Sequence, residues 1–157
     1  MKMLNVTIDG ISTRVAEGTT VMEAAAQLGI DIPALCYLKD VNEVGACRIC
    51  VVEVKGARSL QASCVLPVWE GMEVQTESDA VVAARKEILK LILANHPNDC
   101  LTCSKAGECK LQEYAYRYDV KFVEHKGMRK NYGIDTSNPY IYRDNNKCIL
   151  CGRCVSI

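Results

Sequence analysis

The sequence predicts an α+β protein in which a small domain of strands and a helix precedes a small helical domain and the start of a third domain. Three observations support this prediction. Two short segments near the amino terminus alternate apolar and polar residues, as half-buried strands do. Residues 80–95 carry the apolar period of an amphipathic helix. Ten cysteines fall into three separate groups along the 157 residues.

The first predicted domain covers residues 1–78 and begins with a β-hairpin. Residues 4–9 alternate apolar and polar side chains, and residues 11–15 return as the second strand. Asp9 and Gly10 between them form the favoured pair for a two-residue hairpin turn. We therefore expect two antiparallel strands at the start of the chain.

A helix is predicted next, over residues 19–30. Thr20 is a favoured first-turn cap, and Glu23 three residues later completes the pattern of a capping box. Gly29 is the expected stop signal. Two later strands are predicted over residues 50–56 and 71–77. Two strands, a helix and then more strands is the element order of a β-grasp domain.

The second predicted domain covers residues 79–118. Its first helix, over residues 80–95, has one apolar stripe, formed by Val81, Ala84, Ile88 and Leu91, with Lys86 and Lys90 on the other side. Pro97 breaks this helix, and a second helix is predicted over residues 109–118.

Residues 119–147 have no clear period, and we interpret them as an irregular connector with a short strand at 139–143. Residues 148–157 form the start of the third domain.

Composition and charge exclude several function classes. The formal net charge is +0, so nothing indicates binding to nucleic acid or to an anionic membrane surface. The amino terminus has no apolar signal region, and no stretch reaches the roughly 20 apolar residues of a membrane span. A cytoplasmic location is expected, where thiols stay reduced. Metal or cluster binding is therefore a better explanation of ten cysteines than disulfides are.

The first cysteine group consists of Cys36, Cys47, Cys50 and Cys64, with the spacing C-x10-C-x2-C-x13-C. Four thiolates around two irons is the usual [2Fe–2S] arrangement, so we interpret the first domain as a β-grasp [2Fe–2S] ferredoxin domain. Gly45 and Ala46 are small enough to let backbone N–H groups approach the cluster. The alternative is a zinc site, which usually pairs two short C-x2–4-C knuckles, whereas this group has only one.

The second group consists of Cys100, Cys103 and Cys109, with His96 just ahead of them. Three thiolates need a fourth donor, and His96 is the nearby candidate, because His125 lies outside any ligand spacing. One histidine and three cysteines can hold either zinc or a [4Fe–4S] cluster. The neighbouring cysteine groups favour iron–sulfur.

Residues 96–112 (HPNDCLTCSKAGECKLQ) resemble a mixed histidine–cysteine cluster motif, and residues 36–64 and 146–157 resemble the cluster regions on either side of it. The motif is shared by [FeFe] hydrogenase catalytic subunits, NAD(P)-linked formate dehydrogenase catalytic subunits and the large iron–sulfur subunit of complex I. The resemblance implies a [2Fe–2S] cluster on the first group. It also implies a small helical domain with a histidine-ligated [4Fe–4S] cluster on the second group.

The third group consists of Cys148, Cys151 and Cys154, and the resemblance implies the start of a ferredoxin-like [4Fe–4S] domain there. A fourth ligand for this further cluster is not in the chain. We expect the chain to be the front of a longer polypeptide. The alternative is a short subunit that gains the missing ligand from a partner.

These features predict a non-catalytic electron conduit of a larger oxidoreductase. The resemblance implies a formate dehydrogenase or a hydrogenase, with flavin- or NAD(P)-binding iron–sulfur subunits as partners and ferredoxin as a further candidate. Histidine in place of a thiolate should raise the potential of its cluster. Arg48 and Arg153 lie beside ligands and could raise potentials or be plain surface charges. The predicted walls around the clusters are Leu101, Leu111, Ile149 and Leu150. The alternative function is a zinc-binding interaction module without a redox role.

Overall fold

A computed structural model describes residues 2–128 and 131–157. The chain divides into two compact units. The first unit contains the residues up to Arg85 together with Gly152–Ile157, and the second contains Lys86–Cys151.

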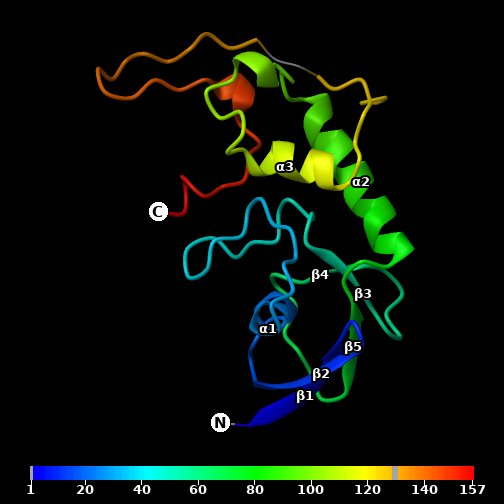
Figure 1. Cartoon of the computed structure of the whole chain (residues 1–157). Helices are drawn as coiled ribbons and strands as arrows, with labels where there is room; N and C mark the ends of the chain where they lie inside the picture. Colours follow the sequence, from blue (N-terminus) through cyan, green and yellow to red (C-terminus); the bar gives the residue numbers. More distant parts are fainter. Residues whose placement is uncertain (1, 129–130) are drawn as a thin grey trace. The chain divides into compact units, whose positions relative to one another are not determined.

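The first unit is built on a five-stranded mixed sheet (Figure 1). The strand order is β2-β1-β5-β3-β4, in which β1 and β5 are parallel and the other pairs are antiparallel. The strands are β1 (Met3–Ile8), β2 (Ile11–Ala16), β3 (Val51–Val54), β4 (Gln61–Ala62) and β5 (Met72–Gln75). The predicted hairpin is confirmed, because Asp9 and Gly10 both have positive φ, as a tight two-residue turn requires.

Helix α1 (Val21–Gln27) packs against the sheet. The predicted capping box is present, with the Glu23 carboxylate accepting from the Thr20 N–H and the Glu23 N–H donating to Thr20 Oγ1. The buried face of α1 and the inward side chains of the strands share one apolar core. This core also contains Cys50 and Cys64, so two of the predicted ligands are fixed by the packing of the domain itself.

Helix α2 (Asp79–Ala94) starts where the sequence predicts, with Ser78 Oγ accepting from the Val81 N–H at 3.4 Å. Its predicted buried stripe is partly wrong. Leu91 is 51% exposed, whereas Arg85 is fully buried on the same side as Val81 and Leu89. Arg85 is stable there because its guanidinium donates to Glu77 at 2.7 Å and to the Val51 carbonyl at 2.8 Å.

The second unit contains helix α3 (Lys110–Arg117), as predicted, and the 3-10 turns η1 (Cys100–Thr102) and η2 (Asn145–Lys147). Within its described residues, the predicted strand at 139–143 does not form, and only an isolated bridge joins Asp135 to Arg143. The reason is local, because the Asn138 side chain accepts from the N–H groups of Tyr140 and Ile141. Those donors are then unavailable to a neighbouring strand.

Candidate iron–sulfur sites

The strands of the first unit bring two predicted ligands together. Val51 of β3 pairs with Ala62 of β4, so Cys50 and Cys64 lie at the same end of this pair. Their Sγ atoms are 3.3 Å apart, and both residues are buried. Ser63 fixes this end further, since its hydroxyl donates to the Cys50 carbonyl at 2.8 Å.

The other two ligands of the first group lie in the loop after α1. The Cys47 N–H donates to Cys36 Sγ at 3.4 Å, and Cys36 is buried. Electrostatic interactions with Cys50, Cys36 and Cys47 help to raise the pKa of the Cys64 thiol, with the Cys50 hydrogen bond as the largest cause. Gly45 links the two pairs of cysteines, because a Cβ added there would lie 3.9 Å from Cys64 Sγ.

The pKa values of the two buried thiols, Cys50 and Cys64, are shifted in opposite directions. The hydrogen bond between the two sulfurs lowers the pKa of Cys50 to about 6 and raises the pKa of Cys64. Burial raises the pKa of Cys36. Cluster ligands bind as thiolates, so four crowded thiols of this kind are a donor set that a multivalent metal centre neutralises.

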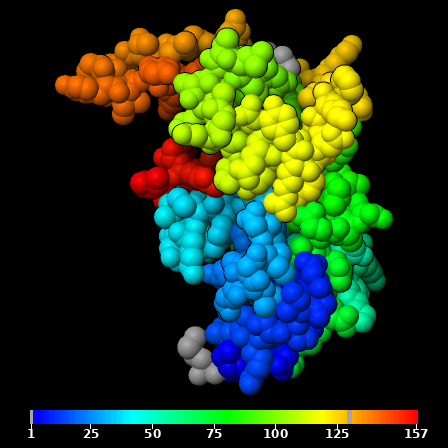
Figure 2. Space-filling model, viewed as in Figure 1, coloured from blue at the N-terminus to red at the C-terminus, as the bar shows by residue number. Residues whose placement is uncertain are grey.

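Small residues allow the loop backbone to approach these sulfurs, as the sequence predicts. Gly45 has φ +62°, and a Cβ added there would lie 3.3 Å from the Val65 side chain and 3.9 Å from Cys64 Sγ. Burial raises the pKa of the Cys36 thiol, and a hydrogen bond from the Ala46 backbone offsets part of that rise. The rest of the loop reaches the surface (light blue in Figure 2), where Val41 and Val44 are exposed.

His96 follows the last turn of α2, and its N–H closes that turn on the Leu93 carbonyl at 3.1 Å. His96 Nδ1 accepts a long hydrogen bond, 3.4 Å, from the Asn98 N–H. His96, Cys100 and Cys109 line one pocket of about 240 Å³, together with apolar residues that include Leu111. This arrangement suits a set of ligands for one cluster, held in a pocket with a largely apolar wall.

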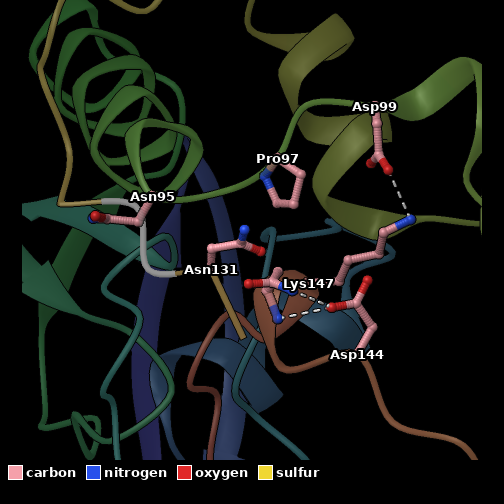
Figure 3. A pocket seen from close by; sticks show the side chains of 7 residues that line it. Asn95, Pro97, Asp99, Asn131, Asp144 and Lys147 are labelled. Carbon is pink, nitrogen blue, oxygen red and sulfur yellow. Dashed lines mark hydrogen bonds and ion pairs between the residues drawn. The ribbon is translucent and has the colours of Figure 1, made fainter. Parts of the chain in front are cut away.

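Cys103 lies one turn after Cys100 and does not line that pocket. It instead meets the ammonium group of Lys147, which pairs with Asp99 at 3.0 Å (Figure 3). Asp99 first, and then Cys103, raise the pKa of Lys147. A cation therefore lies beside the sulfur of a predicted ligand, where it can influence a cluster's potential.

The third group is the most open of the three. Cys148 and Cys154 are exposed and Cys151 is half-buried. Cys148 Sγ accepts from the Leu150 N–H at 3.4 Å. Cys148 and Cys151 belong to the second unit and Cys154 belongs to the first.

Only one of the four predicted wall residues is buried. Leu111 is 4% exposed, Ile149 is half-buried, and Leu101 and Leu150 are exposed. Leu101 and Leu150 lie between two cysteines of a C-x2-C pair, and the structure exposes both of these short turns to solvent. His125, which the sequence predicts to lie outside the ligand set, pairs with Glu87 of α2.

Sequence reasoning missed the polar residues that surround the ligands. Asn42 is buried, with its amide donating to the Cys36 carbonyl, and Lys147 lies beside Cys103. The spacing of asparagine and lysine gives no signal for such contacts. Among residues 2–128 and 131–157, no group of three or more histidine, cysteine, aspartate or glutamate side chains is spaced to hold a single metal ion. No helix in the same part of the chain is long and apolar enough to cross a membrane.

Two family models match the chain. Residues 1–79 match the model described as "2Fe-2S iron-sulfur cluster binding domain". Residues 85–124 match the "NADH-ubiquinone oxidoreductase-G iron-sulfur binding region". Both describe iron–sulfur binding, which favours the electron-transfer interpretation over the zinc alternative.

Similar proteins belong to NAD(P)-linked enzymes. The chain is 45% identical over 98% of its length to the NADP-reducing hydrogenase subunit HndD of Solidesulfovibrio fructosivorans, covering 27% of that protein. It is 39% identical over 98% of its length to the NADH-ubiquinone oxidoreductase 75 kDa subunit of Reclinomonas americana, covering 22%. The chain thus spans about a quarter of the length of these relatives.

A solved structure extends the likeness to the fold. An NAD+-reducing [NiFe]-hydrogenase has a chain that matches with a TM-score of 0.90 and 37% identity, over 98% of this chain and 64% of that one. The α+β fold and the order of the iron–sulfur regions are therefore confirmed. The chain belongs to the family of 2Fe-2S iron–sulfur cluster binding domains and is an iron–sulfur electron-transfer module.

Proposed function

We propose two complete cluster sites in this module. The ligands of a [2Fe–2S] cluster are Cys36, Cys47, Cys50 and Cys64, and those of a histidine-ligated [4Fe–4S] cluster are His96, Cys100, Cys103 and Cys109. The observation that carries the proposal is the buried contact of Cys50 and Cys64, whose Sγ atoms are 3.3 Å apart at the end of a strand pair, beside the loop that carries Cys36 and Cys47. That number and arrangement of donors suits a two-iron centre.

A third site belongs to the same proposal. Cys148, Cys151 and Cys154 supply three ligands of a further [4Fe–4S] cluster. The division into domains at 1–78, 79–118, 119–147 and 148–157 also stays a prediction, as does a cytoplasmic location.

The parent is an NAD(P)H-linked, multisubunit oxidoreductase. The names of the relatives support this, since the hydrogenase subunit is NADP-reducing, the structural match is NAD+-reducing and the third relative is an NADH-ubiquinone oxidoreductase subunit. The partners are then flavin- or NAD(P)-binding iron–sulfur subunits, or ferredoxin. A hydrogenase is the parent that these relatives favour, and a formate dehydrogenase stays a prediction.

The residues of this chain hold the clusters, keep water away from them and adjust their reduction potentials. Each bound cluster would take up one electron and pass it on. The buried Cys36, Cys50 and Cys64 keep water from the first site, and Leu111 does so at the second. The backbone N–H groups of Ala46 and Cys47 aim at Cys36 Sγ, where they favour the more negative, reduced state.

The test is to purify the protein without oxygen and to measure iron, acid-labile sulfide and zinc. We expect a brown protein that holds iron and sulfide and little zinc. After dithionite reduction, paramagnetic resonance should give a slowly relaxing [2Fe–2S] signal and a fast-relaxing [4Fe–4S] signal. A colourless protein that holds zinc in place of iron would contradict the proposal.

A further inference from the structure

The segment after the third cysteine group belongs to the same compact unit as the [2Fe–2S] site. Arg153 reaches the loop of the first group, where its Nη2 donates to the Tyr37 carbonyl at 2.9 Å and its Nε donates to the Cys36 carbonyl at 3.3 Å. Cys36 is a proposed cluster ligand. A side chain that lies between Cys151 and Cys154 in the sequence thus contacts the backbone of a different cysteine group.

Asn42 makes this contact part of a network. Its side chain is 2% exposed, and its amide donates to the same Cys36 carbonyl at 2.8 Å. Its amide oxygen accepts from Ser156 Oγ at 2.8 Å. Two donors therefore occupy both acceptor positions of the Cys36 carbonyl, and a second residue of the carboxyl-terminal segment holds one of them in place.

Gly152 of the carboxyl-terminal segment lies next to Asn42. Gly152 has φ +81°, and a Cβ added there would lie 3.5 Å from the Asn42 amide oxygen. The left-handed backbone at this position favours glycine. The added Cβ would make an ordinary van der Waals contact, so the backbone of the segment lies directly against Asn42.

The charge of Arg153 gives the contact an electrical consequence. A guanidinium is charged at all ordinary pH values, and its hydrogen bonds hold that charge against the ligand backbone. Half-burial reduces the screening by water. A fixed positive charge next to a cluster stabilises the state with one more electron, so it raises the reduction potential.

Arg48 is the natural comparison. It directly follows the ligand Cys47 in the sequence, yet its side chain is exposed to solvent. Its charge is therefore screened by water. Nearness in sequence alone favours Arg48, whereas the observed contacts favour Arg153.

We propose that Arg153 is a positioning residue of the [2Fe–2S] site, which acts through the Cys36 carbonyl to raise the reduction potential of the cluster on the first cysteine group. The third cysteine loop thereby serves two sites, because its cysteines supply ligands to one and its arginine tunes the other. This inference rests on the proposed ligand set of the first group.

The experiment is a redox titration of the [2Fe–2S] paramagnetic signal in the whole protein and in three variants, Arg153→Met, Arg153→Lys and Arg48→Met. Arg153→Met should lower the potential, with a roughly tenfold fall in the ratio of reduced to oxidised cluster at fixed ambient potential, or about 59 mV for one electron. Arg153→Lys should fall between wild type and Arg153→Met, because a lysine keeps the charge but cannot donate to both carbonyls in the same geometry. Arg48→Met should shift the ratio much less.

The outcomes separate this inference from the proposed function. A wild-type protein without a [2Fe–2S] signal overturns the proposed function. A wild-type signal whose midpoint is unchanged in Arg153→Met, or is lowered as much by Arg48→Met, overturns the role of Arg153 alone. If Arg153→Met does not retain the cluster, the further variant Arg153→Gln decides, because glutamine removes the charge but keeps an N–H donor, and an unshifted midpoint there rejects the inference.

Discussion

Replacing Arg85 with methionine should loosen the sheet next to the [2Fe–2S] site. Arg85 is fully buried, and its guanidinium donates at 2.8 Å to the carbonyl of Val51, the residue after the proposed ligand Cys50. Methionine keeps the apolar stem of the side chain but removes the donors and the charge. The Val51 carbonyl is then buried without that donor.

The magnitude follows from three contributions. A buried carbonyl that loses its donor costs about 1–3 kcal/mol. The ion pair with Glu77 adds about 0–1 kcal/mol, because Glu77 is 44% exposed. Relief of the desolvated guanidinium offsets part of this sum. We expect a net loss of about 2 kcal/mol in the free energy of unfolding of the first unit, or up to roughly thirtyfold in the population or rate of opening.

The assay is the rate at which the [2Fe–2S] paramagnetic signal is lost in urea, since loss of a cluster makes unfolding irreversible. Lys86→Met is the matched control, as it removes a cation from the next position of α2. Arg85→Met should lose its signal several-fold to thirtyfold faster than wild type, and Lys86→Met should differ little from it. Equal rates for the two variants would refute the role given to Arg85.

Three further predictions concern the ligands, the cluster environment and α1. Cys64→Ala should abolish the [2Fe–2S] signal and leave the [4Fe–4S] signal, as seen by paramagnetic resonance at two temperatures; a retained [2Fe–2S] signal would remove Cys64 from the ligand set. Lys147→Met should lower the midpoint potential of the histidine-ligated cluster, because it removes a positive charge. Asp99→Asn should raise that potential, because it removes a negative charge. Shifts of the same sign in the two variants would disprove the electrostatic explanation. The Thr20 N–H lowers the pKa of Glu23 from its usual 4.5, so its contribution to stability is present above pH 4.5 and is lost as pH falls through the lower folded value. Glu23→Gln should therefore flatten the acid side of the stability curve, and an unchanged acid slope in urea melts would contradict the role of the capping box.

Local patterns in the sequence predicted the elements that depend on neighbouring residues. The hairpin at Asp9-Gly10, the capping box of Thr20 and Glu23 and the start of α2 all form as expected. Strand β4 was not predicted because its two residues are too few to show alternation. Its pairing with β3 is nevertheless what brings Cys50 and Cys64 together.

Such local patterns could not predict contacts between residues that are far apart in the sequence. The apolar-stripe rule assigns cations to the solvent side. Arg85 is buried instead, and one of the acceptors that stabilise it, the Val51 carbonyl, is 34 positions away. The same holds for Arg153 and Cys36, which are 117 positions apart. The ligand residues themselves could be proposed from sequence, because C-x2-C spacing constrains sulfur geometry within one turn. Their tuning residues could not be proposed.

The most direct test of the central claim is Mössbauer spectroscopy of iron-57-labelled wild type and of His96→Ala and His96→Cys, combined with a redox titration of each. The wild type should show a [2Fe–2S] and a [4Fe–4S] component. His96→Cys should keep the four-iron component at a lower potential, because a thiolate adds negative charge and favours the oxidised state. His96→Ala should lose that component or shed one iron. A normal four-iron component at an unshifted potential in His96→Ala would show that His96 is not a ligand and would contradict the account.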